Sequence, residues 1–135
     1  MSYKQSRGFS LIELMIVVAI VGILTAVAMG FFGDNVTASN RSEGRAGLTA
    51  TAASLEKCKS LYGAYNAGGC NVAAAIATES NYYSIDTTTR TATTFTLTAA
   101  PVVGQPQAND ADCTSLTLTN TGVKGGTGAN AAECW

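Results

Sequence analysis

The stretch "RGFSLIELMIVVAIVGILTAVA", from Arg7 to Ala28, decides the fold of this 135-residue chain. No charged residue occurs from Leu14 to Gly33. A helix of that length, at about 1.5 Å per residue, is long enough to cross a hydrocarbon core of roughly 30 Å. One acidic residue, Glu13, nevertheless stands at the start of this apolar run. A carboxylate in hydrocarbon is costly, so Glu13 requires a partner of opposite charge.

The residues that flank the apolar run indicate a retained membrane anchor rather than a cleaved secretory signal. In a secretory signal, small residues form a cleavage site directly after a short apolar core. Here a basic start with Lys4 and Arg7 leads straight into the run, and no A-x-A site ends it. Because basic residues stay in the cytoplasm, we expect the rest of the chain to lie on the other side of the membrane.

The composition argues against several classes of function. The chain has 8 Lys and Arg, 9 Asp and Glu, no His and a net charge of -1. Nucleic acid is therefore not an expected partner, because binding along phosphates requires clustered positive charge. Without His, a nucleophile motif or a phosphate loop, we expect neither an enzyme nor a cofactor. Asp110 and Asp112 are interpreted as solvated loop acids.

Four cysteines, Cys58, Cys70, Cys113 and Cys134, lie beyond the apolar run. An even number in a small domain that follows a membrane segment indicates two disulfides in an oxidising compartment. A zinc site is the competing interpretation, but no pair has C-x-x-C spacing, and we expect no metal. Of the three possible pairings we choose Cys58 with Cys70 and Cys113 with Cys134, because both close sequence-local loops.

An amphipathic pattern follows Asp34. Leu48, Ala52, Leu55 and Tyr62 recur at helical spacing, which predicts one nearly continuous helix from Phe9 to about Tyr62. Its second half has a single apolar face, suited to packing on a small domain. Several glycines weaken this helix. We interpret them as close-packing sites for neighbouring helices, and the alternative is that the region of Gly30 and Gly33 unwinds during assembly.

The remainder of the chain predicts a small antiparallel sheet. Residues 63–80 are expected to form an irregular loop with a short helical turn at Val72 to Thr78. Strands are predicted at "YYSIDT" (82–87), "TFTLTAA" (94–100) and "SLTLTN" (115–120), which alternate branched or aromatic residues with Thr or Ser. Residues 87–94, "TTTRTATT", are interpreted as a hairpin of threonine-rich strands in preference to a glycosylated stalk. The predicted class is α+β, with a long helix packed on three to four strands.

The junction "RG" followed by "FSLIELM" strongly resembles the class III signal of type IV prepilins. This resemblance implies that a prepilin peptidase cuts after Gly8 and methylates Phe9, the mature N-terminus. It also implies that Glu13 occupies the acidic position of the family. One departure is that Gly30 stands where the family usually has proline. Glycine only loosens a helix that proline would kink, so a family-like bend is not assured here.

The C-terminal end, "DADCTSLTLTNTGVKGGTGANAAECW", is similar to the disulfide-bounded region of type IVa pilins. It most resembles PilE-type minor pilins, which share "DxxCxxLTL", a glycine-rich loop and a terminal "CW". The resemblance implies a pilin fold, with a leader at 1–8, a membrane and filament-core helix at 9–33 and a periplasmic globular part at 34–135.

These features predict a structural subunit of a type IV pilus. The resemblance implies that Glu13 pairs with the terminal amine of Phe9 in a neighbouring pilin. We favour a minor pilin that helps to initiate assembly, and a major pilin or a type II secretion pseudopilin remain alternatives. A receptor pilin that binds DNA is less favoured, because only Lys57, Lys59, Arg90 and Lys124 could supply a basic stripe.

Location and partners follow from the same resemblance. Before assembly we expect a single-pass protein in the inner membrane of a Gram-negative bacterium, and after assembly a pilus on the cell surface. The expected partners are other pilins, the prepilin peptidase and the inner-membrane assembly machinery.

Overall fold

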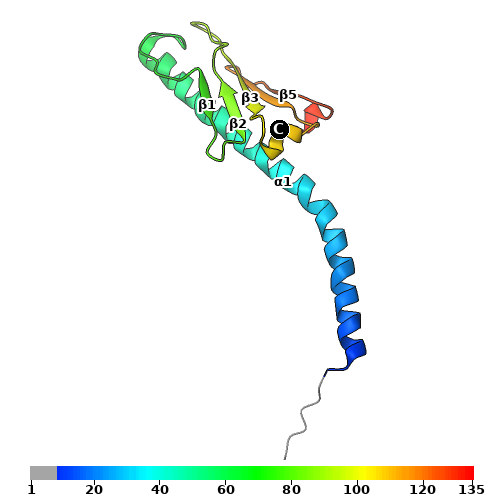
Figure 1. The fold of residues 1–135 in the computed structure, drawn as a ribbon. Coiled ribbons are helices and arrows are strands. Elements are labelled where there is room, and N and C mark those ends of the chain that lie inside the picture. The colour runs from blue at the N-terminus through cyan, green and yellow to red at the C-terminus, as the bar shows by residue number, and fades with distance from the viewer. Residues whose placement is uncertain (1–8) are drawn as a thin grey trace, which may run out of the picture. The chain divides into compact units, whose positions relative to one another are not determined.

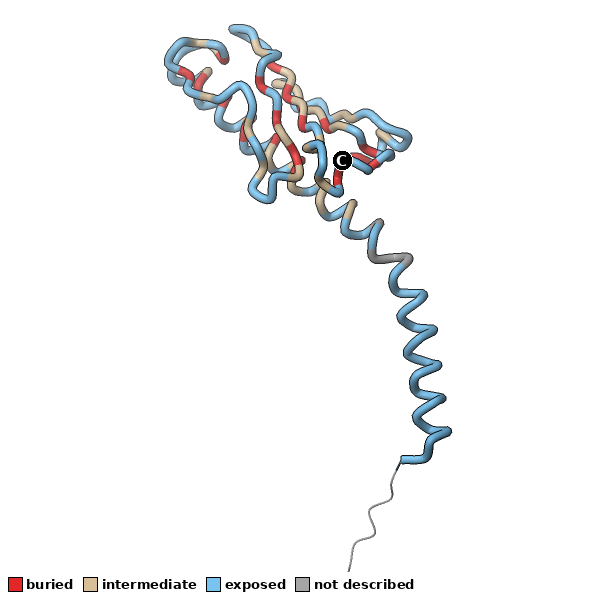
Figure 2. Tube along the Cα trace, viewed as in Figure 1, coloured by how far each residue is buried: buried red, intermediate tan, exposed pale blue. Residues whose placement is uncertain are grey.

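A computed structural model describes residues 9–135, except for the side chains at 30–32 and 34 (Figure 1). The leader predicted at 1–8, including Gly8, lies outside the described residues. Contacts divide the chain into two units, an N-terminal one that ends at Val36 and a second one, Thr37–Trp135, which we call the head. Buried residues occur only in the head, whereas the described side chains of the N-terminal unit are exposed (Figure 2).

One long helix, α1, spans Leu11–Tyr62 and confirms the helix predicted from Phe9 to about Tyr62. It begins directly after Ser10, whose carbonyl accepts hydrogen bonds from the amides of Glu13 and Leu14 at 3.1 and 3.2 Å. It ends at Gly63, which has a positive φ of 79° and donates its amide to the Lys59 carbonyl. Glycine adopts this left-handed conformation without steric cost, and it therefore ends many helices.

Five antiparallel strands follow in a simple meander, with the spatial order β1-β2-β3-β4-β5. Their bounds are β1 Ala75–Ala77, β2 Tyr83–Asp86, β3 Thr96–Pro101, β4 Ser115–Thr119 and β5 Lys124–Thr127. One short 3-10 helix, Pro106–Asn109, lies between β3 and β4, and a second, Ala131–Glu133, follows β5. The α+β class and the three predicted strands are thus confirmed, as β2, β3 and β4.

The sheet nevertheless has two strands, β1 and β5, in addition to the three that the sequence predicted. The helical turn predicted at Val72 to Thr78 is wrong, because Ala75–Ala77 pairs with β2 as an edge strand. Strand β5 was missed because its centre is Gly125-Gly126, and glycine carries no strand propensity. Residues 87–94 connect β2 to β3, and Arg90 forms one isolated bridge with Phe95. The predicted hairpin therefore exists, but its paired strands do not include the threonine-rich residues 87–94.

The core lies between α1 and the sheet. Helix residues Leu48 and Leu55 are fully buried in one cluster with the sheet residues Tyr83, Ile85, Leu97 and Leu116. Two helix glycines make this approach possible. A Cβ at Gly44 would lie 2.9 Å from the Leu116 side chain, and a Cβ at Gly47 would lie 2.6 Å from that of Ile85. These glycines therefore serve packing, as expected, but against the chain's own sheet instead of neighbouring helices.

Candidate filament-assembly segment and head

The N-terminal part of α1 is apolar and exposed. Leu11–Met29 has a mean hydropathy of 2.7, none of it is buried, and it is the one described helix long and apolar enough to cross a membrane. Phe9 lies two residues before this helix and is 80% exposed. Besides Glu13, this segment has one polar side chain, Thr25, whose hydroxyl donates a hydrogen bond to the Val21 carbonyl at 2.7 Å and is thus satisfied inside the helix.

Glu13 lies in the first turn of α1, with its side chain exposed. A carboxylate there is stabilised by the partial positive charge of the helix N-terminus, typically by about 0.3–1 kcal/mol in an exposed position. That amount is small against the cost of moving a charge out of water, so the helix end alone does not compensate Glu13 in an apolar environment. Phe9 and Glu13 therefore both lie at the N-terminal end of an exposed apolar helix.

Two disulfides brace the head. Cys58 pairs with Cys70 across a Cα separation of 5.3 Å, and Cys113 pairs with Cys134 across 5.7 Å. The first joins the end of α1 to the loop that follows, and the second joins the start of β4 to the C-terminus. Each bridges a short sequence separation, 12 and 21 residues, and contributes on the order of 3 kcal/mol in a chain-entropy account.

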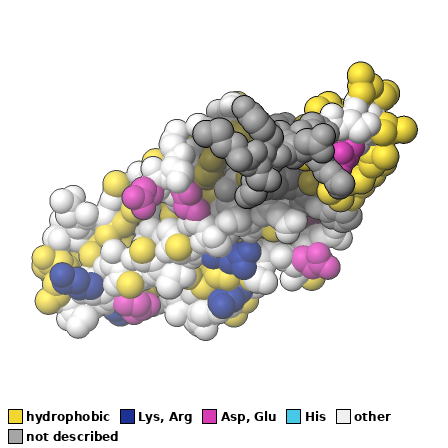
Figure 3. Space-filling view, turned by 90° about the horizontal axis from the view of Figure 1, so that it is seen from below, with side chains coloured by type: hydrophobic (Ala, Val, Ile, Leu, Met, Phe, Trp, Pro, Cys, Tyr) yellow, Lys and Arg dark blue, Asp and Glu magenta, His cyan; other side chains and the backbone are white. Residues whose placement is uncertain are grey.

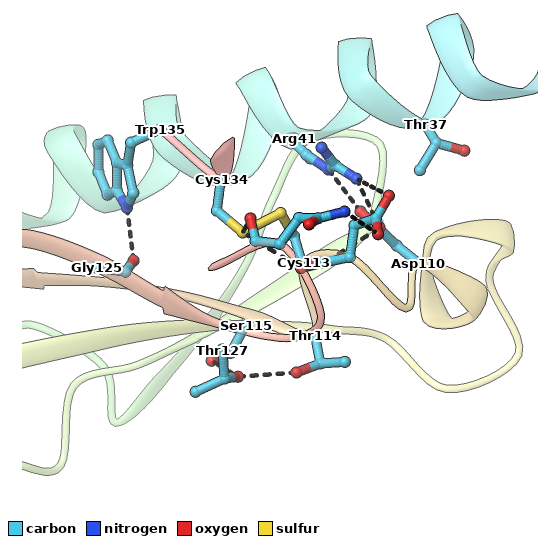
Figure 4. Close-up of a disulfide and its surroundings, with 12 residues drawn as sticks. Thr37, Arg41, Asp110, Cys113, Thr114, Ser115, Gly125, Thr127, Cys134 and Trp135 are labelled. Atoms are coloured by element: carbon cyan, nitrogen blue, oxygen red, sulfur yellow. Dashed lines mark hydrogen bonds and ion pairs between the residues drawn. A yellow bond between two sulfur atoms is a disulfide. The ribbon is translucent and has the colours of Figure 1, made fainter. Parts of the chain in front are cut away.

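The C-terminal loop is held further by polar contacts around the second disulfide (Figure 4). The Trp135 indole donates to the Gly125 carbonyl at 2.7 Å, and the hydroxyls of Thr114 and Thr127 lie 2.8 Å apart. These bonds attach the last residue to β5, and β5 to the start of β4. The terminal loop is therefore a fixed part of the head.

A buried ion pair connects this loop to the helix. The Arg41 guanidinium donates through Nε and an Nη to the two carboxylate oxygens of Asp110, both at 2.7 Å (Figure 4). The exposed fractions of the two side chains are 11% and 2%. Asp110 also accepts from the Gln107 amide at 2.9 Å and from the backbone amide of Cys113 at 3.2 Å. Four hydrogen bonds therefore satisfy this carboxylate and tie α1 to the residue that forms the disulfide.

Burial and hydrogen bonding act in opposite directions on the pKa of Asp110. Burial would raise the pKa, but the hydrogen bond from Arg41, the bond from the Cys113 amide and the positive charge of Arg41 together hold it below its usual value. The same pair raises the pKa of Arg41. Asp110 is therefore ionised throughout the neutral range.

The interpretation of Asp110 as a solvated loop acid is wrong, although Asp112, with a side chain 51% exposed, fits it. The sequence carried a usable signal, because Arg41 stands seven residues before Leu48 on the same helical stripe. An arginine on the buried face of a helix needs an acidic partner, and Asp110 lies beside the disulfide loop that covers this face.

Most basic side chains of the head are engaged in its own structure. The Lys59 ammonium donates to the Ala92 carbonyl at 2.8 Å and lies 5.4 Å from the centre of the Tyr65 ring. Arg90 donates to the Val72 carbonyl at 3.1 Å, and the Lys124 ammonium lies 5.1 Å from the centre of the Trp135 ring. On the face in Figure 3, Lys and Arg side chains form separate groups with acidic side chains between and beside them. The described residues on this face thus form no continuous basic stripe.

Comparison with known proteins places these features in one class. Residues 3–29 match the prokaryotic N-terminal methylation motif. The chain is 52% identical over 40 residues to the fimbrial protein EcpC of Eikenella corrodens, a match that covers 30% of this chain and 26% of that protein. It is 52% identical over 46 residues to the type IV major pilin protein PilA of Myxococcus xanthus, which covers 34% of this chain and 21% of the relative. The chain thus spans about a quarter of these curated relatives.

An apolar N-terminal helix with a methylation motif, followed by a disulfide-braced head on an antiparallel sheet, defines a type IV pilin. A second family model matches residues 31–117, which is more than half of the chain and includes the second half of α1, β1 to β3 and the first residues of β4. The chain belongs to this family, described as the type IV minor pilin ComP, DNA uptake sequence receptor.

Proposed function

We propose that this pilin is a minor subunit of a type IV pilus, stored in the inner membrane and moved into the filament after its leader is removed. The observation that carries the proposal is the exposed apolar helix Leu11–Met29 with Glu13 in its first turn. Lipid covers this helix in the membrane, and the helices of neighbouring pilins cover it in a filament. Contacts of this kind are heterologous and do not close, so they produce a helical polymer.

In this proposal, prepilin peptidase cleaves after Gly8 and methylates Phe9. The new positive amine of Phe9 then pairs with Glu13 of a neighbouring subunit. Two charges in an apolar filament core are tolerated only as a pair. The proposed partners are therefore other pilins, the peptidase and the inner-membrane assembly machinery, in a Gram-negative cell with the head in the periplasm before assembly.

The family description supports a minor role, whereas the matched relatives include proteins named as major pilins. Copy number separates the two. We expect sheared pili from the native strain to contain this chain at well below one-tenth of the amount of the main subunit, measured by quantitative mass spectrometry with isotope-labelled peptides. An amount equal to or above every other pilin would contradict the minor role, and complete absence from sheared pili would contradict the pilus role.

A second candidate function is reception of DNA, which the family description favours although the charge pattern did not. Lys57 and Lys124 are exposed basic side chains that could approach phosphates. If they do, the affinity of the detergent-solubilised full chain for duplex DNA falls steeply between 50 and 200 mM salt.

The lysines provide the matched variants for this test. We expect Lys124→Gln and Lys57→Gln each to lower the logarithmic salt slope by about 1 if the lysine contacts a phosphate. Lys59→Gln is the control for general loss of positive charge, because the Lys59 ammonium already donates a hydrogen bond to the Ala92 carbonyl. Absence of binding at 50 mM salt, or a slope unchanged in both variants, would argue against reception of DNA through these residues.

A further inference from the structure

A shallow groove runs along the head between α1 and the edge strand β1. It consists of three adjoining cavities of about 350, 310 and 320 Å³. The first two share Ala50, Thr51 and Ile76 as lining residues, and the last two share Ser54, Asn71 and Val72. We call this continuous feature the α1–β1 groove. Its helix side extends from Glu43 to Tyr62, which at about 1.5 Å per residue is roughly 28 Å.

At the end near Glu43 the groove is apolar and leaves room for the backbone of a second chain. Small helix residues, Ala46, Gly47 and Ala50, form one wall there, and Ile76 and Ile85 of the sheet form the other. Cavities of roughly 150 Å³ with aliphatic linings already accept a benzene molecule, so about 350 Å³ is ample for an aliphatic side chain and part of its turn. Small residues on a helix allow a neighbouring chain to approach closely.

Negative charge lies at this same end of the groove. Glu43 and Glu79 both line the cavity of about 350 Å³. The Glu43 carboxylate already accepts a hydrogen bond from the Ser80 backbone amide at 3.0 Å. Among the described residues, the ion pairs join Arg41 to Asp110 and Asp112, so Glu79 has no cationic partner there. An occupant of this end should therefore carry an apolar side chain next to a positive charge.

The chain presents such a pair at the opposite edge of its own sheet. Val123 and Lys124 lie at the turn into β5, and β1 and β5 are the two outer strands (Figure 1). Val123 is 62% exposed and Lys124 is exposed. Lys124 rests on the Trp135 ring and, among the described residues, makes no ion pair.

We propose that the β4–β5 turn of one copy docks into the α1–β1 groove of a second copy, with Val123 in the cavity and Lys124 beside Glu79. Because the two surfaces occupy opposite edges of one sheet, each head uses a different edge for each neighbour. A contact of this type is heterologous, and it extends to further copies without closing. This head-to-head contact is separate from the one proposed between Phe9 and Glu13, and it forms only where two copies of this chain are neighbours.

A zero-length carbodiimide cross-link tests the contact directly, since it joins an amine to a carboxylate only when the two touch. Unlabelled and ¹⁵N-labelled full-length chains are mixed in detergent micelles at high concentration, cross-linked, digested and analysed by mass spectrometry. We expect a peptide pair of mixed isotope content that joins Lys124 to Glu79 or Glu43. A cross-link found only within one chain, or a Glu79 cross-link only to a different pilin in intact pili, would overturn the proposal.

Charge reversal provides the second test. Lys124→Glu and Glu79→Lys are each expected to reduce the fraction of dimer at least fivefold. The dimer is measured by sedimentation of the detergent-solubilised chain, because a lysine substitution would itself change the yield of an amine cross-linker, and circular dichroism checks that each variant is folded. The double variant restores the opposite charges across the contact and should recover most of the dimer. Val123→Ser should weaken the dimer, whereas Val103→Ser, a change at a valine 93% exposed on another loop, should not. No recovery in the double variant would contradict the proposed pairing.

Discussion

Substitution Asp110→Ala is expected to lower the free energy of unfolding of the head by about 3–5 kcal/mol. The physical reason is that the largely buried Arg41 side chain, 11% exposed in the intact head, loses the carboxylate that accepts two of its hydrogen bonds. The Gln107 amide and the Cys113 amide lose the same acceptor. Urea unfolding of the full chain in detergent, followed by the fluorescence of Trp135, measures the change.

Asp112→Ala is the matched control. Asp112 lies 3.7 Å from Arg41 but is 51% exposed, so its removal should cost less than about 1 kcal/mol. The double variant Arg41→Met with Asp110→Ala should be less destabilised than the sum of the single variants, because it leaves no uncompensated charge. Equal effects of Asp110→Ala and Asp112→Ala would contradict the role assigned to the buried pair.

The same carboxylate gives stability a defined pH dependence. Its pKa is lower in the folded head than in the unfolded chain, where it is about 3.9. The contribution of Asp110 is therefore complete above that value and is lost as the pH falls through the folded pKa. Asp110→Asn is expected to be less stable than the wild type at neutral pH. Its free energy of unfolding should fall less steeply below about pH 4, because the contribution of the Asp110 carboxylate is already absent.

Much of the fold was predictable from periodicity. The helix to Tyr62 followed from its apolar stripe, and β2, β3 and β4 followed from alternation of branched residues with Thr and Ser. Strands β1 and β5 could not be predicted in this way. Ala75–Ala77 has little side chain to alternate, and β5 contains Gly125 and Gly126, so both are strands because the neighbouring strand offers backbone hydrogen bonds.

The candidate site likewise has one part that the sequence predicts and one part that it does not. The proposed assembly segment is local, since Gly8, Phe9 and Glu13 fall within six consecutive positions, and a short pattern is enough to predict them. The pair of Arg41 and Asp110 joins residues 69 positions apart. Only the meander and the second disulfide bring them together, so the burial of Asp110 depends on tertiary structure that sequence spacing does not contain.

Substitution Glu13→Val is expected to reduce incorporation into pili at least tenfold while membrane insertion is retained. Valine suits lipid better than a carboxylate does, so the membrane-stored form should be unharmed or stabilised. In the filament, however, the amine of a neighbouring Phe9 would lose its counter-charge in an apolar core. Stranding one charge of a buried pair typically costs about 3–5 kcal/mol, which exceeds the roughly 1.4 kcal/mol of a tenfold change.

Thr25→Val is the matched control for this experiment. It also replaces a polar side chain of the apolar run with valine, but the Thr25 hydroxyl bonds only within its own helix, to Val21. We expect this variant to enter membranes and pili in wild-type amounts. A loss of incorporation equal to that of Glu13→Val would indicate a general effect of the substitutions on helix packing.

The most direct measurement of the central claim is the ratio of this chain in sheared pili to the same chain in the inner membrane, quantified by mass spectrometry for wild type, Glu13→Val and Thr25→Val. If Glu13 serves assembly by pairing with a neighbouring Phe9, the ratio falls at least tenfold in Glu13→Val alone. An unchanged ratio in Glu13→Val would contradict that role.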